Sequence, residues 1–394
     1  MGSSPSVIVA GARTPIGKFS GALTAFTGMQ LGGFAIAEAL RRAGVRGDEV
    51  DYVLMGHVLQ AGQGQITARQ AAVAGGIPMD VPCITVNKVC LSGLNAIALA
   101  DALIRAGEIE IAIAGGMESM TNTPYALPSA RAGARMGDTK LVDLMIHDGL
   151  WCAFDGCHMG DASDRVNERM SIGRAEQDEW SARSHERAAD ATKAGRLSEE
   201  IVAVDVPQRK GDPVRVEEDE GIRPGTTAES LAGLRPAFVS DGTITAGNAS
   251  QISDGGAALV VMSAEKAAER GLQPLAEIVA HGQVAGPDTA LHLQPANAIK
   301  AASAKAGLDP AALDLYELNE AFASVAIAAT RDLGIDEAKV NVNGGAVALG
   351  HPIGMSGARL VLTTAYELKR RGGGVGAAAL CGGGGQGDAL LVRV

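Results

Sequence analysis

The sequence predicts an α/β protein built from two similar halves. Short apolar runs alternate with Ala-rich helical patterns over residues 6–120, and small apolar patterning of the same kind returns over residues 251–394. A faint internal repeat supports the duplication, because residues 50–61 resemble 313–324 and residues 84–119 resemble 340–385. In both copies Val-Asn is followed by Ser-Gly, a helix that ends at Gly, and an apolar strand that ends in glycines.

The bulk composition indicates a globular intracellular protein. Hydrophobic residues make up 46% and charged residues 20% of the 394 positions, which is far from the composition of disordered chains. A net charge of −11 argues against general affinity for nucleic acid or anionic lipid. No apolar run is long enough to span a membrane, and the N-terminus lacks the features of a signal peptide. Five sparse cysteines argue against a disulfide framework, so we expect a cytoplasmic protein.

The elements of the first half, residues 1–120, follow in order along the chain. "SVIVAGARTP" opens it with a strand, and "MQLGGFAIAEALRRAG" (29–44) has helical apolar spacing and ends at Gly44, a typical C-cap residue. "EIAIAGGMES" (110–119) is a strand that runs into glycines. We expect residues of about 251–272 to complete this half.

Residues 121–250 interrupt the alternation. They hold about half of the Arg, Asp and Glu, with a predicted amphipathic surface helix at 174–197 and a charged stretch with turn signals at 208–230. We interpret this zone as a loop domain inserted over the sheet, where substrates are commonly recognised. Residues 273–394 then form the second α/β half.

Cys90 lies between a predicted strand, residues 84–87, and a helix that starts near Leu91 or Ser92. The positive end of a helix dipole and free backbone N–H groups stabilise a thiolate, so we expect a lowered thiol pKa here. The alternative is a small buried packing residue, which is the commoner role of a free cysteine.

Three further segments carry candidate residues. In "LNEAFA" (318–323), Asn319 follows a strand, and it is either a helix N-cap or part of a ligand crevice. His351 lies in a Gly-rich, Pro-flanked turn that would hold a base in one orientation, although a lone His is more often structural. An apolar strand ends at Cys381, and the four glycines after it can present N–H groups to a ligand.

Other kinds of site fit these residues poorly. "CAFDGCH" (152–158) does not have a zinc-ligand spacing, no G-x-S-x-G elbow occurs, and no G-x-G-x-x-G follows a strand. Two cysteines, one histidine and one asparagine, each predicted at the end of a strand, instead suit acyl transfer through a thioester. We expect neither a metal nor a bound cofactor.

With "NKVCLSGLNA", "NEAFA", "GGAVALGHPIGMSGAR" and "CGGGGQGDA", the sequence resembles the thiolase family over essentially its whole length, and within it the short-chain members. The resemblance implies a thiolase fold with a five-layered αβαβα core. It implies acetyl-CoA C-acetyltransferase activity, the reversible Claisen condensation of two acetyl-CoA to acetoacetyl-CoA and CoA. Residues 126–143 resemble a tetramerisation loop, which implies a homotetramer or a dimer.

The same resemblance assigns roles to individual residues. Cys90 would carry the acyl group, His351 would activate its thiol, and Cys381 would move the α-proton of the second substrate. Asn319 would hold a water that stabilises the enolate with His351, and the N–H groups of Cys90 and Gly383 would form the other oxyanion hole. The implied substrate-binding and CoA-binding residues are Leu150, His158, Met159, Arg223, Ser230, Ala246, Ser250, Ala321 and Phe322.

Three alternatives remain at this level. A longer-chain 3-ketoacyl-CoA thiolase of β-oxidation is the alternative within the family. A decarboxylating ketoacyl synthase uses two histidines, whereas Asn319 and Cys381 stand here. A non-catalytic acyl-CoA or lipid carrier on the same fold is the alternative from a different class.

Overall fold

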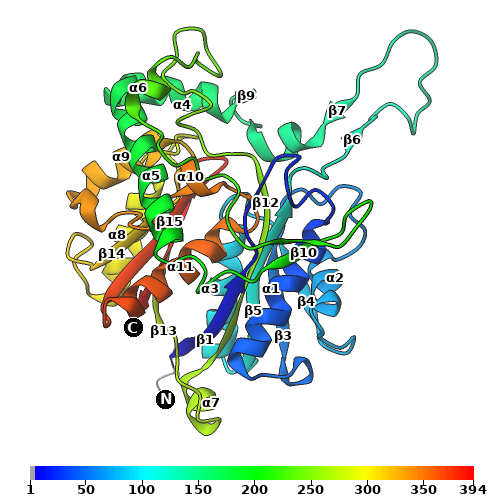
Figure 1. Cartoon of the computed structure of the whole chain (residues 1–394), viewed down its shortest axis with the longest axis vertical. Coiled ribbons are helices and arrows are strands. Elements are labelled where there is room, and N and C mark those ends of the chain that lie inside the picture. The colour runs from blue at the N-terminus through cyan, green and yellow to red at the C-terminus, as the bar shows by residue number, and fades with distance from the viewer. Residues whose placement is uncertain (1–4) are drawn as a thin grey trace.

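The computed structural model describes residues 5–394 and has a mixed sheet as its centre (Figure 1). In this part of the chain ten strands form the sheet in the order β14-β15-β16-β13-β1-β12-β5-β3-β4, with β2 paired to β12. The bounds of these strands are β1 Ser6–Arg13, β2 Gly17–Lys18, β3 Tyr52–Gly56, β4 Cys83–Val86, β5 Ile111–Ser119, β12 Ser253–Ser263, β13 Ala276–Ala285, β14 Leu315–Leu318, β15 Val375–Gly382 and β16 Gln386–Arg393. Three two-stranded sheets lie outside it: β6 Tyr125–Ala126 with β7 Val142–Asp143, β8 Trp151–Cys152 with β9 Cys157–His158, and β10 Val204–Val206 with β11 Val214–Val216.

Helices cover both outer faces and fill the space between the halves. Their bounds are α1 Gly28–Ala43, α2 Thr67–Ala74, α3 Ser92–Arg105, α4 Met159–Met170, α5 Arg174–Lys193, α6 Ala228–Ala232, α7 Ala264–Glu269, α8 Gln294–Ala306, α9 Ala323–Leu333, α10 Ala346–Leu349 and α11 Ser356–Arg370, with short turns η1 Gly47–Glu49, η2 Met145–Leu150 and η3 Glu337–Lys339. α1 begins at a capping box of Thr27 and Gln30, and it ends at Gly44 in the left-handed conformation, the C-cap that its sequence predicts.

The layers follow from which faces pack together. α1 lies on β1, β5 and β12 with α2 beside it, and α8 lies on β13, β15 and β16 with α9 beside it. α3 and α11 contact each other and pack between the two halves of the sheet, so the predicted five-layered α/β core is confirmed (Figure 1). Backbone pairing between the halves is short, because β1 pairs with β13 only at Val7–Glu277 and Ile8–Ala276.

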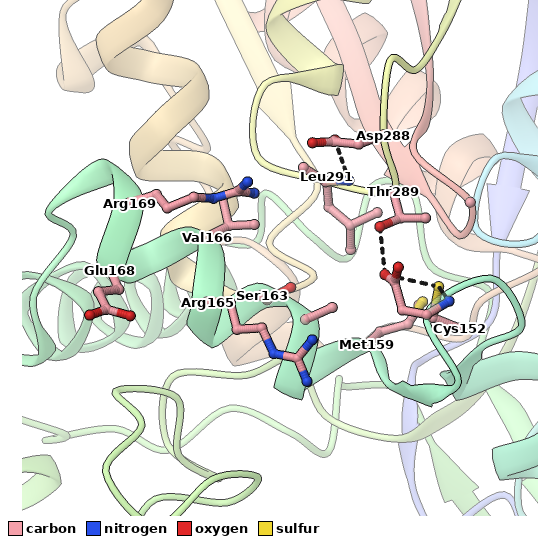
Figure 2. A pocket seen from close by; sticks show the side chains of 14 residues that line it. Cys152, Met159, Ser163, Arg165, Val166, Glu168, Arg169, Asp288, Thr289 and Leu291 are labelled. Carbon is pink, nitrogen blue, oxygen red and sulfur yellow. Dashed lines mark hydrogen bonds between the residues drawn. The ribbon is translucent and has the colours of Figure 1, made fainter.

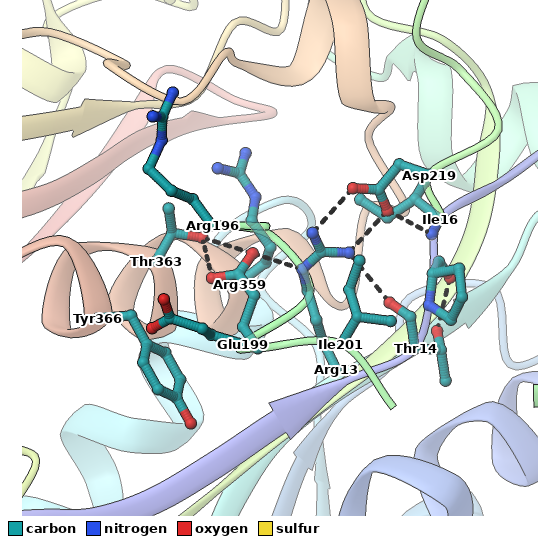
Figure 3. Close-up of polar contacts among 12 residues, drawn as sticks. Arg13, Thr14, Ile16, Arg196, Glu199, Ile201, Asp219, Arg359, Thr363 and Tyr366 are labelled. Atoms are coloured by element: carbon teal, nitrogen blue, oxygen red, sulfur yellow. Dashed lines mark hydrogen bonds and ion pairs between the residues drawn. The ribbon is translucent and has the colours of Figure 1, made fainter. Parts of the chain in front are cut away.

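The segment between the halves is anchored by buried charges (Figure 3). Arg13 of β1 donates hydrogen bonds to Glu200 at 2.7 Å and to both carboxylate oxygens of Asp219 at 2.7 and 2.8 Å. Thr363 of α11 donates to the same Glu200 at 2.9 Å. Residues 200 and 219 therefore connect the inserted segment to elements of both halves. The boundaries predicted at 120, 250 and 272 stay predictions.

The inserted segment contains an exposed arm and a helix that packs against the rest of the protein. An arm that carries β6 and β7 projects from the body (Figure 1), and Met136 near its tip is 99% exposed. The predicted helix at 174–197 is confirmed as α5 but ends at Lys193, and its buried face combines polar side chains, among them Asp178, Ser184 and His185, with the apolar Trp180, Ala188 and Ala191. Among residues 5–394, none of the helices combines the length and apolarity that a bilayer span requires.

Candidate active site

Cys90 stands in a strained turn between β4 and α3. Val89 has φ of 51°, which is rare for a β-branched residue and costs of order 1–3 kcal/mol, so its surroundings must hold it. The Asn87 Oδ1 accepts the Val89 N–H at 3.1 Å. The Ser92 hydroxyl accepts the Lys88 N–H at 2.8 Å and donates to the Val89 carbonyl at 2.6 Å. These side chains fix the turn that presents the Cys90 thiol.

Close backbone approach brings the His351 loop against this turn. A methyl group added at Gly116 of β5 would lie 2.0 Å from the Gly354 carbonyl oxygen, and one added at Gly93 of α3 would lie 2.8 Å from the same atom. Only glycine fits at such contacts. The missing side chains therefore let the loop after Gly350 pack directly onto β5 and the start of α3.

His351 is fixed by hydrogen bonds on both ring nitrogens. The Ser356 hydroxyl donates to the Pro352 carbonyl at 2.9 Å, so it accepts from His351 Nδ1–H at 2.6 Å. That arrangement leaves Nε2 as the unprotonated nitrogen, and the Asn319 amide donates to it at 3.3 Å. His351 follows the helix α10 and not a strand end, so the expectation of four strand-end residues is wrong for this one.

Cys381 and Gly383 come from the other half of the sheet. Cys381 is the penultimate residue of β15, and Gly383 opens the turn to β16. In that turn Gly385 has φ of 69° and approaches the Asp288 carbonyl so closely that a methyl group would lie 1.9 Å from it. The Asn319 N–H donates to the Ala379 carbonyl at 3.0 Å and thus ties Asn319 to the Cys381 strand.

Burial governs the protonation of all three reactive groups. It raises the pKa of the Cys90 thiol to about 12 and lowers the pKa of the His351 imidazole to about 3. It also raises the pKa of Cys381, and the nearby Cys90 adds to that rise. The expected lowering of the Cys90 pKa by the helix terminus is wrong here, because desolvation of the thiolate outweighs it. At neutral pH the site therefore holds two thiols and an uncharged imidazole.

One cavity of about 550 Å³ brings these groups together. Among the residues proposed from the sequence, those that line it are Cys90, Leu150, His158, Met159, Arg223, Ala246, Ser250, Ala321, Phe322, His351, Cys381 and Gly383. Asn319 is fully buried behind His351 and does not line the cavity. Ser230 is exposed and forms a reciprocal capping pair with Thr227, the N-cap of α6, so a role for it in binding stays a prediction.

A series of ring contacts runs along the cavity wall, in which His158, Phe238 and Phe322 line the cavity and Trp151 packs against His158. The ring centroids of Trp151 and His158 lie 5.1 Å apart, those of His158 and Phe238 lie 6.1 Å apart, and those of Phe238 and Phe322 lie 6.0 Å apart. Sequence reasoning missed Phe238, which sits in an irregular segment without a motif. It also missed the lining residues Lys18, Phe19, Met145, Ile146, Gly160, Ala237, Thr245, Ala249, Gln251, Ile252, Leu291, Ile353 and Gly382.

Arg223 is held at the cavity by its backbone. Its N–H donates to His185 Nδ1 at 3.1 Å, and burial together with the Arg223 charge lowers the pKa of His185 to about 4. The imidazole therefore stays neutral and can accept this bond at neutral pH. The segment that carries Arg223 is in this way fixed to α5.

A second cavity of about 470 Å³ adjoins the first (Figure 2). The two share Met159 and Leu291 as lining residues. In the second cavity the Thr289 hydroxyl donates to Asp155 at 2.5 Å, and the Cys152 thiol donates to the same carboxylate at 3.4 Å. Neither Cys90 nor Cys381 lines it, so the reactive thiols belong to the first cavity. In residues 5–394 there is also no group of three or more His, Cys, Asp or Glu side chains placed to hold a metal ion.

Comparisons with known proteins match nearly the whole chain. A family model for the thiolase N-terminal domain matches residues 6–265, and one for the thiolase C-terminal domain matches residues 272–394. The chain is 59% identical to a probable acetyl-CoA acetyltransferase of Mycolicibacterium smegmatis, over 98% of this chain and 100% of the relative. It is 50% identical to an acetyl-CoA acetyltransferase of Cupriavidus necator, over 98% of each chain.

Proposed function

Since the chain belongs to the thiolase family, we propose that it is an acetyl-CoA C-acetyltransferase, which joins two acetyl-CoA into acetoacetyl-CoA and CoA and also catalyses the reverse thiolysis. The observation that carries this proposal is the shared cavity of Cys90, His351 and Cys381, residues that come from both halves of the molecule. The names of the similar bacterial proteins support the acetyl substrate. The reaction would need no bound cofactor.

The first half of the reaction acylates Cys90. Its thiol attacks the thioester carbonyl while His351 Nε2 takes the thiol proton, and the N–H groups of Cys90 and Gly383 stabilise the tetrahedral oxyanion. The C–S bond to CoA then breaks. Cys381, which burial keeps protonated, gives its proton to the leaving CoA thiolate, so that CoA departs as a thiol. Acetyl-Cys90, a Cys381 thiolate and a protonated His351 remain.

The second half forms the carbon–carbon bond. The Cys381 thiolate removes a methyl proton from the second acetyl-CoA, and the enolate oxygen is stabilised by His351 and by a water held by Asn319. The enolate carbon attacks the acetyl carbonyl, and Cys90 leaves as a thiolate that recovers the proton from His351. All three groups return to their starting protonation states, which agrees with their neutral forms in the free protein.

We further propose a cytoplasmic homotetramer. The five free cysteines agree with a reducing compartment. The exposed arm of β6 and β7, which coincides with the segment at 126–143, would contact a second dimer. Its exposed Met136 and Leu141 are suited to an interface between subunits.

Acetyl transfer to Cys90 is the direct test. Incubation with acetyl-CoA should add one acetyl group to the peptide that contains Cys90, and Cys90→Ala should abolish this labelling. Cys381→Ala should still be acetylated, although more slowly because the leaving CoA thiolate loses its proton donor, and it should lose the exchange of substrate α-protons with D₂O by about 10²-fold or more. Cys83→Ala, on the neighbouring strand β4, is the matched control and should retain both.

Two outcomes would contradict the proposal. Tight acetyl-CoA binding without any acetyl-Cys90 would indicate a carrier. A steady rise in kcat/KM with 3-ketoacyl chain length would indicate a longer-chain thiolase.

A further inference from the structure

The two reactive thiols belong to different halves of the molecule, and the turns that carry them meet through packing, with Gly382 against Leu91 and Gly383 near Val89. Backbone pairing between the halves covers two residue pairs of β1 and β13. Near the thiols, however, an ion pair joins positions 88 and 388 across the halves. We propose that Lys88 and Asp388 are positioning residues, whose ion pair sets the place of Cys90 relative to Cys381 and Gly383 for acyl transfer. This inference rests on the proposed function.

The contacts around Asp388 are short and specific. Lys88 Nζ lies 2.7 Å from Asp388 Oδ1 and 3.0 Å from Oδ2, and the Asn95 amide of α3 donates to Oδ2 at 3.2 Å. His281 Nε2 of β13 lies 3.8 Å from the same Oδ2. The Asp388 side chain is fully buried, whereas that of Lys88 is 19% exposed. Three elements besides β16 thus direct polar groups toward one buried carboxylate.

Both ends of the ion pair lie close in sequence to the chemistry. Lys88 precedes Cys90 by two residues and belongs to the turn in which Val89 has positive φ. Asp388 stands opposite Leu380 in the β15–β16 ladder, and the adjoining pair of that ladder is Cys381 with Gly387. A displacement of the Lys88 side chain would therefore shift Cys90, two residues along the same turn. A displacement of Asp388 would shift Cys381, which is next to Leu380 in the paired strand.

The physics of a buried carboxylate makes this contact a restraint on distance. Removing a charge from water is costly, so a buried carboxylate requires its counter-ion at hydrogen-bonding distance. A buried ion pair adds little net stability compared with apolar residues, and its usefulness lies more in holding one arrangement. In the proposed reaction both thiols must reach the same two acetyl groups. A misplacement of about 1 Å can lower the rate of such a step about 100-fold.

The test measures the distance between the two thiols by chemical cross-linking, independently of the condensation rate and of correct folding. Dibromobimane, a short reagent that bridges adjacent thiols, should join Cys90 to Cys381 in the wild-type protein, with the bridge mapped by peptide mass spectrometry. In Lys88→Met we expect a clearly lower yield of this bridge and a kcat for condensation lower by about 10- to 100-fold. Alkylation of Cys90 by iodoacetamide, which needs neither Cys381 nor Gly383, should stay within about threefold of wild type, and Lys88→Arg should restore most of the bridge and the rate.

Two further variants keep the test decisive. Lys88→Met with Asp388→Asn removes both charges and leaves no buried charge without a partner, so it should fold even where a single variant does not, and it should show the same losses. Lys300→Met breaks an ion pair with Asp332 that is remote from the cavity, and it should match wild type.

The inference is overturned where the double variant folds and retains both the bridge and the condensation rate. It is likewise overturned where alkylation falls as far as condensation does. A wild-type protein without acetyl transfer would contradict the proposed function, but the yield of the bridge would still test the ion pair.

Discussion

At the scale of single residues, Ser356 decides which nitrogen of His351 can act as a base. Its hydroxyl has one proton, which goes to the Pro352 carbonyl, so Nδ1 must carry the imidazole proton and Nε2 keeps its lone pair. The imidazole is almost fully buried and neutral, and it depends on this contact for its tautomer and its orientation. A serine that never touches substrate therefore controls the first proton transfer.

Ser356→Ala should lower kcat by about 10- to 100-fold with little change in KM, because the neutral imidazole would then populate both tautomers and orientations. Steady-state thiolysis of acetoacetyl-CoA measures both constants. Ser303→Ala is a matched control, since Ser303 is also a fully buried helical serine but its hydroxyl has no partner among residues 5–394. An unchanged kcat in Ser356→Ala would exclude this role for the serine.

What the sequence reveals at this scale depends on residue type and motif. Cys90, His351 and Cys381 could be found because reactive side chains stand beside glycines or a helix start, and the structure places them at one cavity. Their pKa values could not be predicted, because the balance between the helix terminus and desolvation depends on packing around Cys90. Phe238 and Asp388 carry no local signal, since their importance comes from partners more than 70 residues away.

At the scale of elements, glycines let a loop, a helix start and a strand meet backbone to backbone. Gly93 and Gly116 both face the Gly354 carbonyl, and this contact holds the His351 loop against the Cys90 turn. The sequence predicts close packing from its many glycines but not which of them meet. The polar contacts on the buried face of α5 were missed for a related reason: Ser184 donates to Glu320 at 2.8 Å, and apolar periodicity does not reveal such a contact.

Gly116→Ala should be strongly destabilising and should lower activity, because its methyl group would overlap the Gly354 carbonyl oxygen and push the His351 loop away. We expect a loss of about 2 kcal/mol or more in the free energy of unfolding, measured by urea denaturation. Gly233→Ala is the control, since no atom lies near its added methyl group and its φ of −76° suits alanine. Equal stabilities for the two variants would contradict the close contact at Gly116.

At the scale of the whole molecule, the protein buries many ionisable groups between its layers. Arg13 with Asp219 and Glu200, and Arg359 with Glu317, lie almost entirely out of solvent. Burial lowers the pKa of His292 to about 4 and that of His351 to about 3, so both are neutral in the folded protein. In the unfolded chain each would titrate near 6.5.

The free energy of unfolding should therefore decrease as pH falls below about 6.5. In that range His185, His292 and His351 become protonated in the unfolded chain but stay neutral in the folded protein. At about pH 5, His292 and His351 should each lower the free energy of unfolding by an amount of order 2 kcal/mol. Glu317 acts in the opposite direction: burial raises its pKa to about 8, so its contribution decreases as pH rises above its ordinary value of 4.5. Burial also raises the pKa of Asp254, and three histidines against these two carboxyls leave a net loss of stability on acidification.

Calorimetry at about pH 6.5 and pH 5 measures this as a drop in Tm. Replacement of the exposed His147 by Asn should leave the drop unchanged. A Tm that is constant over this range would contradict the neutral burial of these histidines.

The general architecture was accessible from the sequence, because the alternation of strands and helices and the internal repeat both survive in β3, α3 and β5 and in β14, α11 and β15. The order of strands across the sheet was not accessible, since β12 pairs on both sides, and β16 on its β13 side, with strands distant in the chain. Nor could the sequence reveal the short pairing of β1 with β13, which depends on the twist of two finished half-sheets.

The position of β16 also has a consequence for how the protein is made. This strand, residues 386–393, is inserted between β15 and β13, and the turn before it carries Gly383. A ribosome-bound chain can assemble the first half around α1 and α3 well before these residues are translated. The active site, however, cannot form until residues 386–393 have left the exit tunnel. Activity should therefore appear only at the end of synthesis and without a partly active intermediate.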